Sequence, residues 1–300
     1  MSSGEVRCRT CGPTGRQQIT KSPSNGERMG LPRRLLHTVF AGVIGVSSGP
    51  DTLADPAFLR YAPGQLDCAR FQETSRGNVE TYTAGRARRE SVGLEGEWRF
   101  RAQPGRADSV QVEAWFDTLS VWRRTAEANL RPDTDPVIGG RYRGVVSRDG
   151  RYRADARPFV PDDIAEVADL SRALDDLLPR LPTQPLPVGA TWTDEAGLEI
   201  RRLADSAGVD SVLRFRSTLR RETREGALRG DSIPLSLTQR TREDGSFAWH
   251  ARRGLLRRER HITIETEVPP EPRVQRAVRA RVEQNVVLER IPDECEPTQR

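Results

Sequence analysis

The stretch VQRAVRARVEQNVVL, residues Val274–Leu288, alternates apolar and polar side chains for most of its length. One parity is apolar, and its members are Val274, Val278, Ala280, Val282, Val286 and Leu288. The other parity is polar, and its members are Gln275, Arg279, Arg281, Glu283, Asn285 and Glu289. Successive side chains of a strand point to opposite faces of a sheet, so this pattern predicts a long strand with one buried and one wet face.

The same alternation recurs at residues 110–116, 213–219, 233–237 and 262–264, and Gly-containing turn signals separate the runs. This spacing favours hairpins and antiparallel sheet over crossovers. Residues 162–180 differ, because their apolar side chains form a helical stripe that begins at Asp162 and ends at Arg180 between prolines. The sequence therefore predicts a mainly β fold with two similar curved antiparallel sheets, half-barrel or sandwich-like, joined by one amphipathic helix near residues 162–180.

Two Gly-centred stretches with arginines and aromatics, residues 142–152 and 247–256, lie on either side of this helix. They suggest an internal duplication. We accordingly expect a first β-rich half at 55–160, a helix and Pro-rich linker at 161–187, a second β-rich half at 188–292 and a disordered tail at 293–300.

The N-terminal region has the layout of an export signal. Arg33 and Arg34 precede an apolar run of 12 residues, Leu35–Val46, and small polar residues follow it. The run is too short to span a bilayer. We expect residues 29–54 to be a signal peptide and residues 1–28 to be a disordered extension upstream of the true start. The mature protein would then be periplasmic or extracellular, without a transmembrane segment.

The basic net charge of +5 comes from this N-terminal region. Residues 1–48 hold seven cations and two acids, whereas residues 49–300 hold 41 of each. A protein that binds a phosphate backbone needs a clustered positive field. The charge distribution therefore disfavours nucleic acid as a partner.

Four cysteines are present. Cys8 and Cys11 form one C-x-x-C pair, but a structural zinc site needs a second ligand pair nearby. Cys68 and Cys295 lie near opposite ends of the expected mature chain, and in an oxidising compartment such cysteines usually pair. We therefore predict a disulfide between Cys68 and Cys295. The alternative is two separate thiols, one buried and one on a frayed tail.

Residues 181–192, LPTQPLPVGATW, resemble the Pro-rich lead into a V-G-x-x-W strand found in an uncharacterised family of exported bacterial proteins. The resemblance implies a β-rich half and a helix before the motif and a second β-rich half after it. It carries over no catalytic residue. In architecture the arrangement is also similar to the curved half-barrels of periplasmic lipoprotein carriers, which is an analogy of fold alone.

No motif forms an assembled active site. Gly45–Gly49 matches the G-x-S-x-G pattern, but the chain before it is too short for the strands that such a turn requires. His250 and His261 fall on two strands that we expect to pair, and Glu259 or Glu265 could supply a third metal ligand. The spacing of these residues matches no recognised metal-binding motif. We expect no catalytic residue, no metal and no cofactor. A hydrolase that uses His250 or His261 is the least favoured alternative.

Trp115 and Trp122 fall on the polar parity of a predicted strand or near its edge. Strand tryptophans usually belong to a core, but these two are candidates to line the concave side of a curved sheet. The leading hypothesis is a non-catalytic exported protein that binds an apolar or lipid-like ligand there. The alternative is a structural or protein-interaction module of the cell envelope, whose partner would be another envelope protein.

Overall fold

The computed structural model describes residues 59–83, 85–205, 212–228, 234–269 and 277–292. The predicted extension, signal peptide and C-terminal tail lie outside these residues. The predicted first β-rich half is described from residue 59 onward. Among the described residues, no helix is long and apolar enough to cross a membrane.

The described chain is mainly β, as the alternation predicts. The helical elements are α1 (Pro63–Leu66), α2 (Asp162–Ala165) and a 3-10 turn (Leu170–Arg172). The strands are β1 (Arg70–Thr83), β2 (Arg86–Pro104), β3 (Val110–Arg124), β4 (Asn129–Leu130), β5 (Tyr142–Val146), β6 (Tyr152–Ala156), β7 (Thr191–Thr193), β8 (Leu198–Arg202), β9 (Val212–Leu228), β10 (Pro234–His250), β11 (Gly254–Val268) and β12 (Val278–Ile291).

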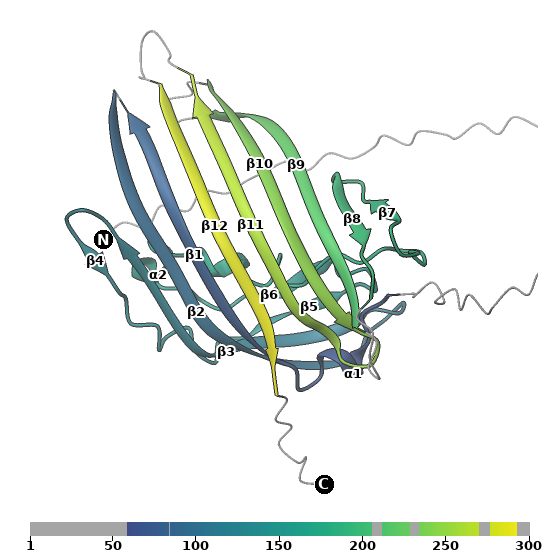
Figure 1. Ribbon diagram of the computed structural model, residues 1–300. Coiled ribbons are helices and arrows are strands. Elements are labelled where there is room, and N and C mark those ends of the chain that lie inside the picture. Colours follow the sequence, from purple (N-terminus) through teal and green to yellow (C-terminus); the bar gives the residue numbers. More distant parts are fainter. Residues whose placement is uncertain (1–58, 84, 206–211, 229–233, 270–276, 293–300) are drawn as a thin grey trace, which may run out of the picture. The chain divides into compact units, whose positions relative to one another are not determined.

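These strands form one open antiparallel sheet of 12 strands, in the order β6-β5-β3-β2-β1-β12-β11-β10-β9-β8-β7, with β4 beside β3. The first long strand pairs with the last, from Arg70 opposite Ile291 to Thr83 opposite Val278 (Figure 1). The prediction of two separate sheets is therefore wrong. Alternation identifies a strand and its faces, but it does not reveal which distant strand provides the hydrogen-bonding partner, and the β1–β12 ladder merges the two halves.

The prediction of one helix over residues 162–180 is also wrong. Only Asp162–Ala165 and the short turn at Leu170–Arg172 are helical. The Asp169 carboxylate accepts hydrogen bonds from the backbone N–H and hydroxyl of Ser171, at 3.2 and 2.6 Å. Such a local side-chain bond competes with helix continuation. The apolar side chains of the expected stripe are nevertheless buried: Ile164, Leu170, Leu174, Leu177 and Leu178.

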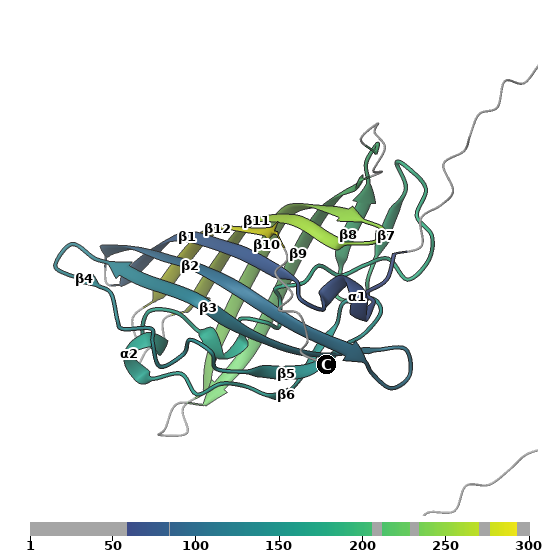
Figure 2. The same cartoon turned by 90° about the horizontal axis from the view of Figure 1, so that it is seen from below.

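Residues 157–190, which we call the covering segment, pack against one face of the sheet (Figure 2). We call this the inner face and the opposite one the outer face. The segment is hydrogen-bonded to widely separated strands: the Tyr142 hydroxyl of β5 donates to the Leu170 carbonyl at 2.7 Å, and Arg202 of β8 donates to the Leu186 carbonyl at 2.8 Å. The sheet curves so that both ends reach the same short segment.

Aromatic side chains fill the space between the covering segment and the sheet. Trp98 of β2 is fully buried and lies 3.8 Å from the Phe116 ring and 5.2 Å from the Tyr142 ring, between centroids. Phe215 of β9 stacks on Phe247 of β10 at 4.7 Å. Each such side chain contributes on the order of 2–3 kcal/mol when it leaves water. The half of the sheet that contains these rings, which we call the base half, is therefore closed by the chain itself.

Candidate functional site

In the other half of the long strands, the tip half, the inner face of β1, β12 and β11 carries no charged side chain, whereas the neighbouring strand β2 presents Arg88 and Glu90 on that face. Antiparallel register places Val79 of β1, Val282 of β12 and Ile264 of β11 side by side. With their neighbours on the same parity they form a surface three strands wide that we call the inner strip. Its members are Val79, Thr81, Ile262, Ile264, Thr266, Ala280 and Val282. All are half-buried except Ile262, which is buried where the strip meets the base half.

The outer face of the same half is charged instead. Ion pairs cross neighbouring strands from Glu80 to Arg89 at 2.6 Å and from Glu267 to Arg279 at 3.1 Å. A further pair joins Glu222 and Arg240 at 3.0 Å. The outer face is therefore the hydrated face of this part of the sheet. The inner strip differs from it, because none of its side chains is charged.

A band of polar side chains lies between the inner strip and the base half, and we call it the polar shelf. Its members are Ser75, Glu243, Arg258, Arg260 and Gln284. Arg260 donates to both carboxylate oxygens of Glu243, from Nε at 2.9 Å and from Nη2 at 2.8 Å. Gln284 donates from Nε2 to the Ser75 hydroxyl at 2.7 Å. Buried polar groups of this kind need partners to offset lost hydration, and here they find them in one another.

Arg258 joins the polar shelf to the covering segment. Its Nη1 donates to the carbonyl oxygens of Asp176 and Leu177, at 2.5 and 3.0 Å. Burial, reinforced by the charge of Arg260, lowers the pKa of Arg258 to about 10. Burial acts to raise the pKa of Glu243, but the Arg260 hydrogen bonds and charge outweigh it and hold that pKa below its usual range.

Glu73 lies on β1, beside the polar shelf. Its Oε2 accepts a hydrogen bond from the Trp98 indole N–H at 2.7 Å. Burial raises the pKa of this carboxyl, and the indole bond and the two arginines oppose that shift only in part. The protonated form of Glu73 is therefore favoured more than in water.

The structure places Trp115 and Trp122 on the outer face of β3, half-buried. The Arg141 guanidinium lies 3.6 Å from the centre of the Trp115 ring. The Trp122 ring lies over Gly93, where an added Cβ would come within 2.3 Å of the ring and could not be accommodated. Neither residue faces the covering segment, so neither lines the inner face as the sequence interpretation supposed. A role for them in ligand binding stays a prediction.

The two histidines do not lie opposite each other. His261 is opposite Asp244 on β10, whereas His250 is opposite Gly254 at the turn. The His250 Nδ1 accepts from the backbone N–H groups of residues 252 and 253, at 3.2 and 3.1 Å. His261 lies in an outer-face groove of about 490 Å³ and shares a 2.8 Å hydrogen bond with the Asn285 amide oxygen. Across the described parts of the chain, no group of three or more His, Cys, Asp or Glu side chains is placed to hold a metal ion.

Cys68 lies in a left-handed turn between α1 and β1, with φ of 58°. Cys295 lies outside the described residues. The last described β1–β12 pair, Arg70 with Ile291, is two residues after Cys68 and four residues before Cys295 along the chain. The register therefore favours the predicted disulfide, which stays a prediction.

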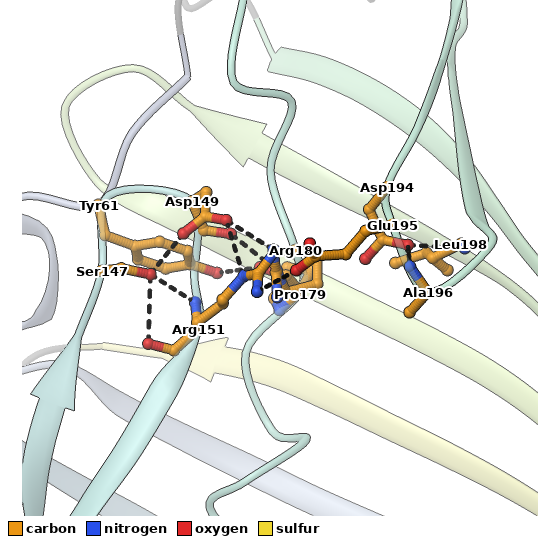
Figure 3. A network of polar contacts seen from close by, with 10 residues as sticks. All are labelled: Tyr61, Ser147, Asp149, Arg151, Pro179, Arg180, Asp194, Glu195, Ala196 and Leu198. Carbon is orange, nitrogen blue, oxygen red and sulfur yellow. Dashed lines mark hydrogen bonds and ion pairs between the residues drawn. The ribbon is translucent and has the colours of Figure 1, made fainter. Parts of the chain in front are cut away.

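A polar network fastens the end of the covering segment to the β5–β6 turn (Figure 3). The Asp149 carboxylate accepts from Arg180 Nη2 at 2.6 Å and from the Ser147 hydroxyl. The Tyr61 hydroxyl donates to the Pro179 carbonyl at 2.9 Å. Although burial raises it, the pKa of Asp149 stays below its usual range because Ser147 and Arg180 stabilise the carboxylate. Asp149 is consequently a weak base for activating Ser147, and the network acts as a fastening.

The polar shelf could not be identified from the sequence. Its charged members are three residues of an arginine-rich and acid-rich chain, and nothing in their local spacing distinguishes them from surface pairs. The inner strip had a signal, because Ala280 and Val282 belong to the stretch with the clearest alternation. The missing information was the set of strands that lie beside them.

No family model matches this chain, and no curated protein matches it. Among solved structures, a lipovitellin chain described for its lipid–protein interactions is similar with a TM-score of 0.41 and 8% identity. The match covers 78% of this chain and 26% of that one, so this chain spans about a quarter of the length of the structure it matches.

Proposed function

We propose that this is an exported, non-catalytic protein that binds an apolar or lipid-like ligand against the inner strip. The observation that carries the proposal is the contrast between the two faces of the three central strands of the tip half, β1, β12 and β11. The outer face carries paired charges at Glu80, Arg89, Glu267 and Arg279, whereas no residue of the inner strip is charged.

The size of the strip suits a single alkyl or acyl chain. It runs about 14 Å from Ile262 to Thr266, at about 3.4 Å per residue, and it is three strands or about 14 Å wide. Covering about 200 Å² of this surface would contribute roughly 5 kcal/mol before the entropic cost of association. That is a usable binding energy for a carrier that must also release its ligand.

A matched pair of substitutions on β11 tests the proposal. Ile264→Gln introduces a polar side chain on the inner strip, and Thr263→Gln introduces the same side chain on the outer face one residue away. We expect Ile264→Gln to weaken binding of a neutral pyrene-labelled alkyl probe at least tenfold and Thr263→Gln to leave it unchanged. Equal binding by both variants would exclude the inner strip as the site.

Two further measurements address the cellular part of the proposal. Lipid extracts of the mature protein, analysed by mass spectrometry, should contain acyl chains. The N-terminal sequence of the protein recovered from the cell envelope should begin after the predicted signal peptide. Recovery of the full chain from the cytoplasm would contradict export.

One observation favours the second candidate, a protein-interaction module. Phe159 follows the edge strand β6 between Pro158 and Pro161, and it is 81% exposed. An exposed aromatic ring flanked by prolines in the sequence is typical of an interface anchor. Under this reading Phe159→Ser abolishes binding to an envelope partner without affecting the alkyl probe.

A further inference from the structure

We propose that the polar shelf makes the site selective for anionic amphiphiles, with an acidic head group against Arg258 and Arg260 and the alkyl chain along the inner strip. This inference rests on the function proposed above and adds the chemical class of the ligand. In the implied orientation, the head group of the ligand lies at the polar shelf and the end of its alkyl chain points away from the base half.

The polar shelf has a charge imbalance. Two guanidinium groups share one ion-paired carboxylate, because Glu243 lies 2.8 Å from Arg260 and 3.7 Å from Arg258. The other hydrogen bonds of these two guanidinium groups, among the described residues, go to neutral carbonyl oxygens of the covering segment. The Glu73 carboxyl is directed to the Trp98 indole instead.

The Glu73 carboxyl also acts on Arg260 through space, so its protonation affects this imbalance. Burial raises the pKa of Glu73, which disfavours its negative form. The positive charge of Arg260 helps to lower the pKa of Arg258. The Asp176 side chain also acts on both arginines, but it is exposed and therefore screened by water. In its ion pairs the polar shelf thus has two guanidinium groups to one carboxylate, an excess of positive charge that a bound anion would reduce.

The charged groups of the polar shelf are largely buried. The side chains of Arg258, Arg260 and Glu243 are 11%, 15% and 7% exposed, respectively. Charges that are shielded from water interact more strongly than surface charges, and an uncompensated one is costly. An anion here would gain more than at the exposed outer-face arginines.

The polar shelf lies next to the inner strip. Arg260 and Ile262 are two residues apart on the same face of β11, so the polar shelf begins about 7 Å from the inner strip. The hydrogen-bonded pair of Ser75 and Gln284 lies on the two neighbouring strands, β1 and β12. A single amphiphile can therefore contact the arginines with its head group and the strip with its chain.

The test compares ligands of one chain length on the full chain. Hexadecanoate, hexadecyl phosphate and hexadecanol compete with the neutral pyrene-labelled alkyl probe at pH 7.5. We expect at least one anion to bind ten times more tightly than hexadecanol or better, and the tighter anion identifies the head-group chemistry. Equal binding of all three ligands overturns this inference and leaves the proposed function intact. Failure of all three and of the probe overturns the proposed function itself.

Variants then locate the selectivity. Arg260→Gln should reduce the preference for the anion to less than threefold while probe binding persists, and Arg281→Gln on the outer face should leave the preference unchanged. If Arg260→Gln does not fold, the double variant Glu243→Gln/Arg260→Gln removes both charges of the pair at nearly constant volume. A folded variant that keeps the full preference overturns the assignment to the polar shelf.

Discussion

Substitution of Glu243 by Gln should be among the most destabilising conservative changes in this sheet. Glu243 is the carboxylate that pairs with two largely buried guanidinium groups, at 2.8 Å from Arg260 and 3.7 Å from Arg258. Removing one partner of a buried ion pair leaves the other charge uncompensated, which typically costs about 3–5 kcal/mol. Because the arginine side chains retain 11–15% exposure, we expect the lower end of that range.

The assay is equilibrium unfolding in urea at pH 7, with Glu265→Gln as the matched control. Glu265 lies on the outer face, 3.8 Å from Arg281, and both side chains are at least 40% exposed. Exposed pairs contribute less than about 1 kcal/mol. If Glu243→Gln costs no more than Glu265→Gln, the arginines are better solvated than their burial indicates, and the argument for an anion at the polar shelf loses its basis.

Three other perturbations follow from the structure. Glu73→Gln keeps an acceptor for the indole N–H and should make stability depend less on pH at the acid end. Because the folded-state pKa of Glu73 is raised, the stabilisation from its protonated form is full below about pH 4.5 and is lost as pH rises through that folded-state pKa. Melting temperatures of wild type and variant at pH 4 to 7 will show the difference. Gly150→Ala should cost about 2–3 kcal/mol in urea unfolding, because φ is 86° and the new Cβ would lie 2.5 Å from a carbonyl oxygen. Cys68→Ser and Cys295→Ser should each lower the melting temperature of the oxidised protein and not of the reduced one, and equal melting temperatures in oxidised wild type and variants would rule out the disulfide.

The strands could be predicted from the sequence because they depend on local alternation. Residues 278–288 form part of β12, and the polar parity found in the sequence is the outer face in the structure. The hairpin turn at Gly254 was also identifiable, since its φ of 75° favours glycine. These features are decided within a few residues.

The parity of β3 could not be predicted by the same reasoning. The strand alternates with Phe116 inward, but the register shifts between Glu97 and Trp98 of the partner strand, and Leu119 and Val121 continue on the inner face. Such a bulge adds one residue and exchanges the two faces. Trp115 and Trp122, which differ in parity by number, consequently share the outer face, which counting along the sequence does not reveal.

The candidate site could not be predicted, because its residues lie on strands that are far apart in the sequence. The inner strip joins Val79 to Val282 and Ile264 across a ladder between the first and the last long strand. Each of these residues is ordinary within its own strand, because a half-buried β-branched side chain fits any pleated surface. The property that suggests binding is the absence of charge over three adjacent strands. It exists only once β1 pairs with β12, and that pairing joins strands from opposite ends of the described chain.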